Sequence, residues 1–306
     1  MISICIPIYN FDVRELVETL SKQSDILKAP TEIILIDDCS DYNFKEINEE
    51  SCSKYNYIKL EKNIGRAAIR NKFLDYASYG YLLYLDCDSV INRDDFLENY
   101  LSEIQKFSSA VVCGGRVYSN IKPNRNKMLR WVYGTKRESQ PYHVRKLHPN
   151  KSFMTNNFIV KRNVFEMVKF DEKLSGYGHE DTLFGYELKK NKIIVSHIDN
   201  PILNGDIESN NEYLKKTNEG MANLASIFSF YGHNQDLINT IKLLGLYFNI
   251  KKFKRIISLT FFLFKPFVLF LLTKGYVNLY LFDYYKLGLL VENIQRRECS
   301  ETKYVF

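Results

Sequence analysis

Asp86 and Asp88, separated by one residue, are the side chains of this sequence best suited to chemistry. They follow the apolar run 81–85, which predicts a buried strand. We therefore expect both carboxylates at the rim of a sheet, where open α/β folds bind their ligands. Hard carboxylate oxygens at such a rim suit Mg²⁺ or Mn²⁺ carrying a phosphorylated ligand. A strand-to-loop turn with two solvated aspartates would give the same pattern, so the pair alone leaves both interpretations open.

Four further polar segments lie at the ends of predicted elements: 7–10 (Pro-Ile-Tyr-Asn), 37–40 (Asp-Asp-Cys-Ser), 63–71 (Asn-Ile-Gly-Arg-Ala-Ala-Ile-Arg-Asn) and 176–181 (Gly-Tyr-Gly-His-Glu-Asp). A carboxylate at 37–38 can accept from a base N–H or a ribose hydroxyl. Gly65 allows a ligand to approach the backbone, and Arg66 and Arg70 can face a diphosphate. Each segment also has a structural explanation, such as a helix cap or a solvated helix face. Their joint occurrence at successive strand ends favours one binding site.

The elements that must position these residues alternate along the first half of the chain. Apolar runs predict strands at 2–6, 32–36, 57–60, 81–85, 110–113 and 153–160. Helical spacing is seen at 13–21, 66–79, 94–107 and 180–190. Alternating strands and helices predict a mostly parallel sheet covered on both faces. We expect a first domain over residues 1–220 and a helical extension over 221–306.

The segment 116–151 lacks clear periodicity and is rich in basic and aromatic residues. A long irregular stretch inside a compact domain is usually functional or mobile. Its aromatic faces, such as Trp131, could stack on the rings of a ligand, and Arg137 could bind an anionic group. We therefore predict a loop that closes over a ligand, with a solvated insertion as the alternative.

The C-terminal region combines a basic segment, 251–255, with the apolar run 256–272, which Lys265 and Pro266 interrupt. A membrane span needs about 20 apolar residues, so this run is expected to fall short. A basic amphipathic helix lying on an anionic bilayer fits better. A core helix or a dimer interface is the alternative.

Composition limits the remaining choices. The 306 residues carry a formal net charge of +6, which favours acidic ligands or an anionic surface without singling out nucleic acid, and no nucleic-acid partner is predicted. The six cysteines form no C-x-x-C pair, so free thiols in a reducing compartment are expected and a zinc site is not. The N-terminus enters a strand at once, and we expect no signal peptide.

The opening segment 4–10, together with 37–40, 63–71, 85–88 and 178–181, resembles the family 2 glycosyltransferases, which are inverting enzymes of the GT-A fold. The resemblance covers roughly residues 1–204, and five motifs in this order are far more specific than Asp-x-Asp alone. It implies an α/β fold with a mostly parallel, Rossmann-like central sheet, here followed by a helical, membrane-associating extension. It also implies a nucleotide-diphosphate sugar donor, most often UDP-linked, with Mn²⁺ or Mg²⁺.

The resemblance also implies roles for individual residues. Asp181 would be the catalytic base, with Glu180 beside it, and Asp88 and Asp86 would bind the metal. His179, Trp131 and Arg137 are expected to contact the acceptor. The donor would be held by Pro7, Tyr9, Asp37, Asp38, Asn63, Gly65, Arg66, Arg70, Asp86 and Asn157, and Asn156 matches the same polar strand end as Asn157.

One departure concerns the third metal ligand. Related chains often carry a histidine where this sequence has Asn204, and His197 lies several residues earlier. An asparagine offers a carbonyl oxygen, which is a weaker ligand for a hard cation. Asn204 and His197 are both kept as candidate ligands, and a buried structural role for His197 is the alternative.

We therefore predict a metal-dependent hexosyltransferase that extends a bacterial cell-surface glycan or a lipid-linked acceptor. It would be cytoplasmic and peripheral on the cytoplasmic face of the inner membrane. Two alternatives remain open. One is a nucleotidyltransferase of similar fold, which would release pyrophosphate and would need no base at 180–181. The other is a non-catalytic glycan- or nucleotide-binding protein, which only Asn204 favours.

Overall fold

The computed structural model of the chain describes residues 1–174, 176–205, 207–231 and 234–303. They form two compact units, which are treated separately. The sheet unit comprises Met1–Ser119, Arg137–Lys173 and Glu180–Asp206, and the helical unit comprises Asn120–Lys136, Leu174–His179 and Ile207–Phe306. The boundary predicted at residue 220 falls inside a helix of the helical unit, Asn210–Tyr231, and the division into two domains at that point stays a prediction.

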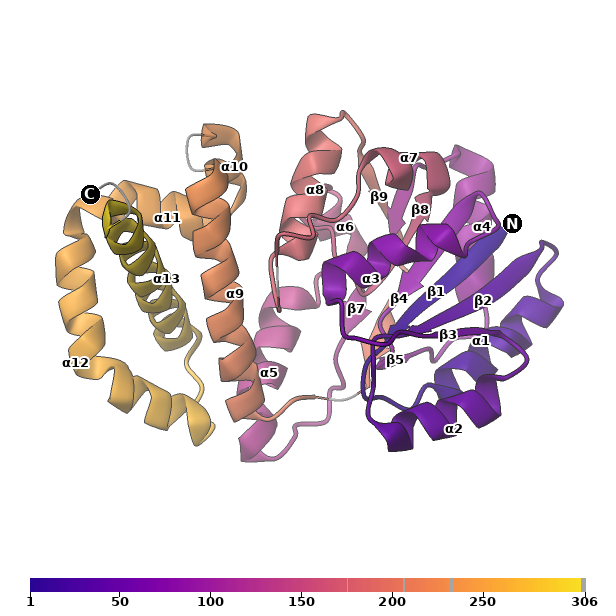
Figure 1. The fold of residues 1–306 in the computed structure, drawn as a ribbon, viewed down its shortest axis with the longest axis horizontal. Coiled ribbons are helices and arrows are strands. Elements are labelled where there is room, and N and C mark those ends of the chain that lie inside the picture. The colour runs from indigo at the N-terminus through magenta and orange to yellow at the C-terminus, as the bar shows by residue number, and fades with distance from the viewer. Residues whose placement is uncertain (175, 206, 232–233, 304–306) are drawn as a thin grey trace. The chain divides into compact units, whose positions relative to one another are not determined.

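The sheet unit is built around seven strands in the order β3-β2-β1-β4-β8-β6-β9 (Figure 1). The strands β3, β2, β1 and β4 are parallel to one another, and β6 is parallel to β9, whereas β8 runs antiparallel to both β4 and β6. The predicted mostly parallel sheet is therefore confirmed, with one reversed strand. The strands are β1 (Ile2–Ile8), β2 (Thr31–Asp37), β3 (Asn56–Lys59), β4 (Tyr81–Leu85), β6 (Val111–Cys113), β8 (Asn157–Lys161) and β9 (Val195–His197).

Helices cover both faces of this sheet because its strands are apolar on both sides. Ile4 and Ile6 of β1 belong to a core cluster that includes residues of α1 and α4, while Cys5 belongs to a second cluster with residues of α3 and α8. Successive side chains of a strand point to opposite faces, which explains this division. The helices of the unit are α1 (Arg14–Ile26), α2 (Tyr42–Cys52), α3 (Arg66–Lys72), α4 (Phe96–Phe107), α6 (Tyr142–Arg145), α7 (Arg162–Met167) and α8 (Glu180–Lys190).

A small second sheet extends the rim of the first. It contains β5 (Ser89–Val90), β10 (Ile202–Asn204) and β7 (Arg116–Val117), in that order. β10 is antiparallel to β5, which sets Asn204 opposite Ser89, and parallel to β7, which sets Ile202 opposite Arg116. The little sheet thus brings two segments distant in sequence to the strand end that carries Asp86 and Asp88.

Several elements differ from the sequence prediction. The strand 81–85 and the helix 180–190 are confirmed, but α2 was not predicted. β1 continues through Pro7 to Ile8, although proline was expected to end it. Its pairing with β4 stops at Cys5, so Pro7 has only one strand neighbour to satisfy. The helix predicted over 66–79 ends at Lys72 and is followed by a 3₁₀ turn, Phe73–Asp75. The segment 116–151, expected to be irregular, contains the strand β7 and the helix α6. It also contains three short helical elements at 125–127, 128–133 and 134–138.

The helical unit is built on three long helices, α9 (Asn210–Tyr231), α12 (Lys254–Thr273) and α13 (Leu279–Lys303), and α13 packs against the other two. The ring of Phe282 on α13 lies 5.5 Å from that of Tyr133 and 5.8 Å from that of Tyr213, centre to centre. The shorter elements are η2 (Arg125–Lys127), α5 (Met128–Tyr133), the π-turn η3 (Gly134–Glu138), which runs on into the sheet unit, α10 (Gln235–Thr240), α11 (Lys242–Ile250) and η4 (Lys251–Phe253).

The apolar C-terminal segment is longer than the sequence run suggested. Lys242–Thr273 is long and apolar enough to cross a membrane by length and composition, with a mean hydropathy of 2.1 in its best window. This corrects the expectation that the run falls short, which counted residues from 256 and treated Lys265 as an interruption. Core helices of soluble proteins pass the same test but are mostly buried, whereas only 17% of this window is buried.

Candidate active site

Asp86 stands at the centre of an alternating series of charges at the end of β4. Its Oδ1 accepts from Arg70 Nη2 at 2.9 Å, and its Oδ2 lies 3.6 Å from Arg116 Nη2. Arg116 in turn lies 3.4 Å from Glu138, and Arg70 and Arg66 lie 3.9 and 4.0 Å from Glu180. We call this series the charge chain, and its members are Glu138, Arg116, Asp86, Arg70, Glu180 and Arg66.

The arginines decide the charge state of Asp86. Burial pushes the pKa of this carboxyl upward, but Arg70, Arg66 and Arg116 outweigh it and hold the pKa below its usual value. Asp86 is therefore an anion at neutral pH. Arg70 is 2% exposed, and its Nη1 and Nη2 donate to the Arg66 carbonyl and to Asp86. The side chain of Arg66, in contrast, is 42% exposed.

The two aspartates at the end of β2, Asp37 and Asp38, organise the loops around the site. Asp37 is fully buried and accepts from the Ser40 backbone N–H at 2.7 Å and from the Tyr57 hydroxyl at 3.1 Å. Asp38 accepts from the backbone N–H groups of Ile64 and Gly65 at 2.7 and 3.0 Å. Both carboxylates therefore fix the segments that surround the end of β2.

Asp38 also explains the entry into α3. The Asn63 side chain donates to the Asp38 backbone carbonyl at 3.1 Å. The Asn63 side chain and the backbone N–H groups of residues 64 and 65 are therefore all bonded to Asp38. Gly65 has φ of +84°, a conformation that other residues adopt only with strain. The sharp turn ends directly at Arg66 and thereby starts α3 at the rim. Pro7 and Tyr9 lie at the same edge, at the end of β1, and Tyr9 is 55% exposed.

Asp88 and Asn204 are brought together by the small sheet. Asn204 is opposite Ser89 in the ladder, and the Gly205 backbone N–H donates to the Asp88 carbonyl at 3.0 Å. A side chain at Gly205 would lie 2.8 Å from that carbonyl oxygen, so the close approach depends on glycine. The backbone of Asp88 thus lies next to the segment that carries Asn204, whose amide oxygen is of a kind that hard cations bind.

The donor set fits a divalent cation that is shared with a ligand. Among the described residues no group of three His, Cys, Asp or Glu side chains is assembled for a metal. Mg²⁺ and similar ions are commonly held by one or two carboxylates together with substrate phosphates. Asp86, Asp88 and the Asn204 carbonyl suit that arrangement. Cys87, between the aspartates, stays a thiol, because burial and the two carboxylates raise its pKa to about 12.

His197 is engaged elsewhere. Its Nδ1 accepts from Arg145 Nη1 at 2.8 Å, and its Nε2 donates to the Pro149 carbonyl at 2.8 Å. Burial lowers its pKa to about 4, so the ring is neutral. Both ring nitrogens are used in joining the segment 145–149 to β9, which argues against the predicted role of His197 as a metal ligand.

Glu180 and Asp181 open α8 beside the charge chain. Asp181 accepts from the Thr182 backbone N–H at 2.6 Å. Loss of water around it, and then the charges of Glu180 and Glu138, raise the pKa of Asp181 to about 6. A carboxylate of this pKa is a stronger base than an ordinary aspartate and is ionised at neutral pH.

The two asparagines at the start of β8 have different surroundings. Asn157 is fully buried, donates to the carbonyls of Gly115 and Asn200, and accepts from the Tyr100 hydroxyl at 2.6 Å. Its amide is thus used inside the fold. Asn156 is 3% exposed, and its Nδ2 has no hydrogen-bond partner in the described part of the chain. Its carbonyl accepts from the Asp86 backbone N–H, so this buried donor stands beside the aspartate pair.

The three predicted acceptor residues belong to both units. Trp131, on α5, and His179 belong to the helical unit, whereas Arg137 belongs to the sheet unit and is exposed. His179 has φ of +70°. Their assignment to the acceptor stays a prediction.

Sequence reasoning missed Arg116, Tyr118 and Glu138. The Tyr118 hydroxyl donates to Glu138 Oε2 at 2.6 Å, beside the Arg116–Glu138 pair. All three lie in the segment 116–151, which has no periodicity. One sequence signal could have located Arg116 and Tyr118. The predicted strand 110–113 ends at Gly114 and Gly115, so the residues that follow lie at an end of the sheet.

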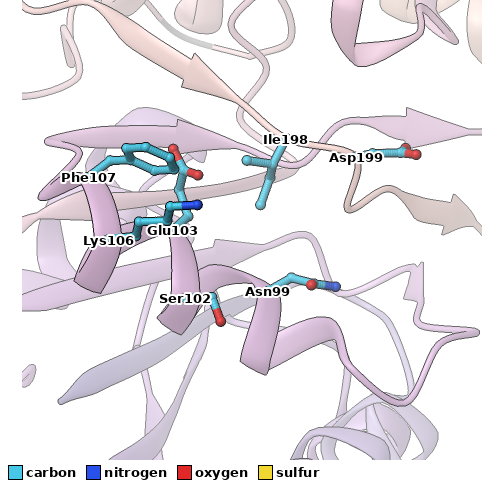
Figure 2. A pocket seen from close by; sticks show the side chains of 7 residues that line it. All are labelled: Asn99, Ser102, Glu103, Lys106, Phe107, Ile198 and Asp199. Carbon is cyan, nitrogen blue, oxygen red and sulfur yellow. The ribbon is translucent and has the colours of Figure 1, made fainter.

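The sheet unit also carries an open pocket apart from these residues (Figure 2). It lies between α4 and the segment after β9, and it contains none of the predicted site residues. Figure 2 shows the side chains that line it: Asn99, Ser102, Glu103, Lys106, Phe107, Ile198 and Asp199.

Comparison with known proteins identifies the family of this chain. The model of the family described as Glycosyl transferase family 2 matches residues 3–168. The chain is 38% identical over 84 residues to a cholesterol galactosyltransferase of Borreliella burgdorferi, which covers 27% of this chain and 23% of that protein. It is 34% identical over 97 residues to the poly(ribitol-phosphate) beta-N-acetylglucosaminyltransferase TarS of Staphylococcus aureus, covering 30% of this chain and 17% of TarS. The matches therefore span about a fifth of the length of these relatives.

Solved structures share the fold over most of the chain. Residues 1–349 of TarS in complex with UDP-GlcNAc give a TM-score of 0.51 at 18% identity, covering 94% of this chain and 90% of that one. A mannosyltransferase from Pyrobaculum calidifontis, solved with GDP-Man and Mn²⁺, gives a TM-score of 0.55 at 14% identity, covering 80% of this chain and 69% of that one. The predicted GT-A fold is confirmed.

Proposed function

Because the chain belongs to glycosyl transferase family 2, we propose that it moves a sugar from a nucleotide-diphosphate sugar, a UDP-sugar, to a hydroxyl of a cell-surface glycan or lipid-linked acceptor, with inversion at the anomeric carbon. The observation that carries this proposal is the arrangement at the end of β4. There Arg70 lies between Asp86 of the aspartate pair and Glu180, and Asp181, next to Glu180, has a pKa raised to about 6.

The donor diphosphate would lie against the positive members of the charge chain. The exposed guanidinium of Arg66 attracts it, and Arg116 adds charge near Asp86. Asp88, Asp86 and Asn204 would hold Mn²⁺ or Mg²⁺. When bound, such a cation neutralises charge that builds on the departing diphosphate. The buried Asn156 Nδ2 supplies one further donor to a bound ligand.

Asp181 would act on the acceptor. It takes the proton from the acceptor hydroxyl as that oxygen attacks the anomeric carbon, and the bond between that carbon and the diphosphate oxygen breaks. The electron pair of that bond leaves with UDP. Attack from the opposite face inverts the anomeric centre, and no covalent intermediate on the enzyme is needed. Glu180 raises the basicity of Asp181 and is proposed to contact the acceptor.

The remaining assignments complete the proposal. Pro7, Tyr9 and the loops held by Asp37 and Asp38 would frame the nucleoside, and His179, Trp131 and Arg137 would contact the acceptor. The basic C-terminal region would keep the enzyme on the cytoplasmic face of the inner membrane, beside a lipid-linked acceptor. The apolar segment described above, of whose best window only 17% is buried, supports a location at a membrane.

Calorimetric titration of the protein with UDP, with and without Mn²⁺, tests the proposal, and GDP serves as the control nucleotide. We expect metal-dependent binding of UDP over GDP, followed by slow release of UDP from at least one UDP-sugar in a hydrolysis screen. Binding of UDP without hydrolysis or transfer would support a non-catalytic binding protein. Release of pyrophosphate from a nucleoside triphosphate would support a nucleotidyltransferase.

A further inference from the structure

The outer face of α12 is an apolar surface without a partner among the described residues. Seven large apolar side chains on this helix are between 55% and 73% exposed. Monomeric soluble proteins rarely expose so large a contiguous apolar surface. The side chains of this outer face are Ile256, Leu259, Phe262, Leu263, Phe264, Phe267 and Phe270.

The tertiary structure removes the one charge from this face. Lys265 is the only charged residue between 256 and 273. Its Nζ lies 2.9 Å from Glu292 of α13 and 5.1 Å from the centre of the Phe261 ring. The lysine is therefore turned onto α13, and the outer face carries no formal charge over about 18 residues, or roughly 27 Å of helix.

The opposite side of α12 fixes it to α13. Phe261, Val268 and Leu272 are buried. A side chain at Gly288 of α13 would lie 2.2 Å from the Phe261 ring, so the two helices pack closely at that point. Figure 1 shows α13 running beside α12. The outer face is thus held in place by a packed inner side.

Basic residues lie at both ends of the outer face. Lys251, Lys252 and Arg255 are exposed at its start, and Lys274 is exposed just after its end. Positive charge at the rim of an apolar surface complements anionic lipid headgroups. Pairing of two copies through this face, in either direction, would set basic ends against one another, which disfavours a second copy as the occupant.

We propose that the outer face of α12 inserts into the headgroup–acyl boundary of an anionic bilayer with its axis in the membrane plane, so that the helical unit is a monotopic anchor. This inference rests on the membrane location in the proposed function. It adds which surface binds and excludes a spanning helix.

The charges of α13 decide between lying in the plane and spanning. Lys265–Glu292 and Lys254–Glu298 join α12 to α13 along the length of α12, and α13 also carries the Asp283–Lys286 pair. A spanning α12 would carry these groups into the hydrocarbon, where charged side chains are costly. Insertion in the plane leaves α13 on the water side.

The first test is flotation with vesicles of phosphatidylcholine, with and without phosphatidylglycerol. In the Phe262→Gln/Leu263→Gln/Phe267→Gln variant we expect binding to anionic vesicles to weaken at least about 100-fold, because burial of each large apolar side chain is worth about tenfold. The matched control is Ile26→Gln/Leu147→Gln/Ile194→Gln, three side chains of the sheet unit that are 75%, 72% and 72% exposed. We expect it to bind as the unchanged protein does.

The second test measures depth. In a Trp131→Phe background, tryptophan is placed at Ile256, Leu263 or Phe270, which share one side of the helix at seven-residue spacing. The fluorescence of each tryptophan is quenched with lipids brominated at different depths. Insertion in the plane predicts equal quenching of the three variants by lipids that carry bromine near the headgroups. A spanning helix predicts deep quenching at 263 and shallow quenching at 256 and 270, and would overturn the in-plane geometry.

Three outcomes would refute the inference: unchanged vesicle binding of the Gln variant, equal loss in the control variant, or a soluble dimer that the Gln variant makes monomeric. Hydrolysis of the UDP-sugar in detergent-free solution is measured on the flotation samples, which are the unchanged protein, the Gln variant and its control variant. Loss of vesicle binding with hydrolysis retained supports the anchor. Absence of hydrolysis in the unchanged protein, with vesicle binding intact, would count against the proposed enzyme and not against the anchor.

Discussion

Replacing Asp181 with asparagine should stabilise the protein at high pH while it lowers turnover by about 10²-fold or more. The pKa of Asp181 is raised from 3.8 to about 6 because the fold withdraws water from it and sets Glu180 and Glu138 nearby. A raised pKa means that folding disfavours the carboxylate. Each unit of pKa shift corresponds to about 1.4 kcal/mol. The ionised Asp181 therefore costs at most about 3 kcal/mol of folding free energy above pH 6.

The sign of the pH dependence follows directly. Below pH 3.8 the side chain is protonated in both states and the cost vanishes, whereas between about pH 4 and pH 6 the cost grows as the unfolded chain ionises first. Asp181→Asn keeps an oxygen that can accept from Thr182 and cannot ionise. Its gain in the free energy of unfolding should be about 3 kcal/mol at pH 8 and about half of that at pH 5.

Urea unfolding followed by circular dichroism at pH 4, 5 and 8 measures this difference. Asp94→Asn, which removes an exposed carboxylate of the same unit, controls for the loss of a surface charge. Turnover of the Asp181→Asn variant should fall by about 10²-fold or more, the loss expected for a general base, with UDP binding retained. A variant that is less stable at pH 8 than at pH 4, relative to the unchanged protein, would refute the environment assigned to Asp181. Unchanged turnover would refute its role.

Three further predictions address the pH dependence of turnover, the metal ligand Asp88 and the turn at Gly115. The value of kcat/KM should rise with pH with a midpoint near 6, since Asp181 must be ionised. Glu180→Gln should move this midpoint to lower pH, because it removes a neighbouring negative charge. A pH–rate profile with an unmoved midpoint would contradict the coupling between the two carboxylates. Asp88→Ala should abolish the effect of Mn²⁺ on UDP affinity in calorimetry, and equal metal dependence in the variant would reject Asp88 as a ligand. Gly115→Ala should lower the free energy of unfolding by more than about 2 kcal/mol, because Gly115 has φ of +96° and its new Cβ would meet the buried Arg145 Nη2 at 2.6 Å; stability within about 0.5 kcal/mol of the unchanged protein would show that the turn yields.

The central part of the fold could be predicted because its signals are local. The strand 81–85 is an uninterrupted apolar run, and such a run is stable only with both faces covered. The aspartates that follow it must then lie at the strand end. The motifs at 37–40, 63–71 and 178–181 could be ordered along the chain in the same way, and their order pointed to the family that the comparison identified.

Contacts across the chain were beyond such reasoning. Arg116 reaches Asp86 because β7 pairs with β10, and nothing near residue 116 indicates that pairing. His197 was a reasonable metal ligand by residue type, yet Arg145, from a segment expected to be a mobile loop, takes its Nδ1. The backbone N–H groups that donate to Asp37 and Asp38 were not indicated by the sequence either, and contact of these two carboxylates with a ligand stays a prediction.

The sequence by itself determined which chemistry is available: an aspartate pair at a strand end, a glycine before two arginines, and a carboxylate pair opening a helix. Only the tertiary structure decided how those groups are charged and where the apolar surface lies. The pKa of Asp181 depends on Glu138, 43 positions away in sequence, and the apolar outer face of α12 depends on Glu292, which draws Lys265 inward. Electrostatic energy and burial depend on distances in space, and a sequence specifies those distances only after the chain has folded.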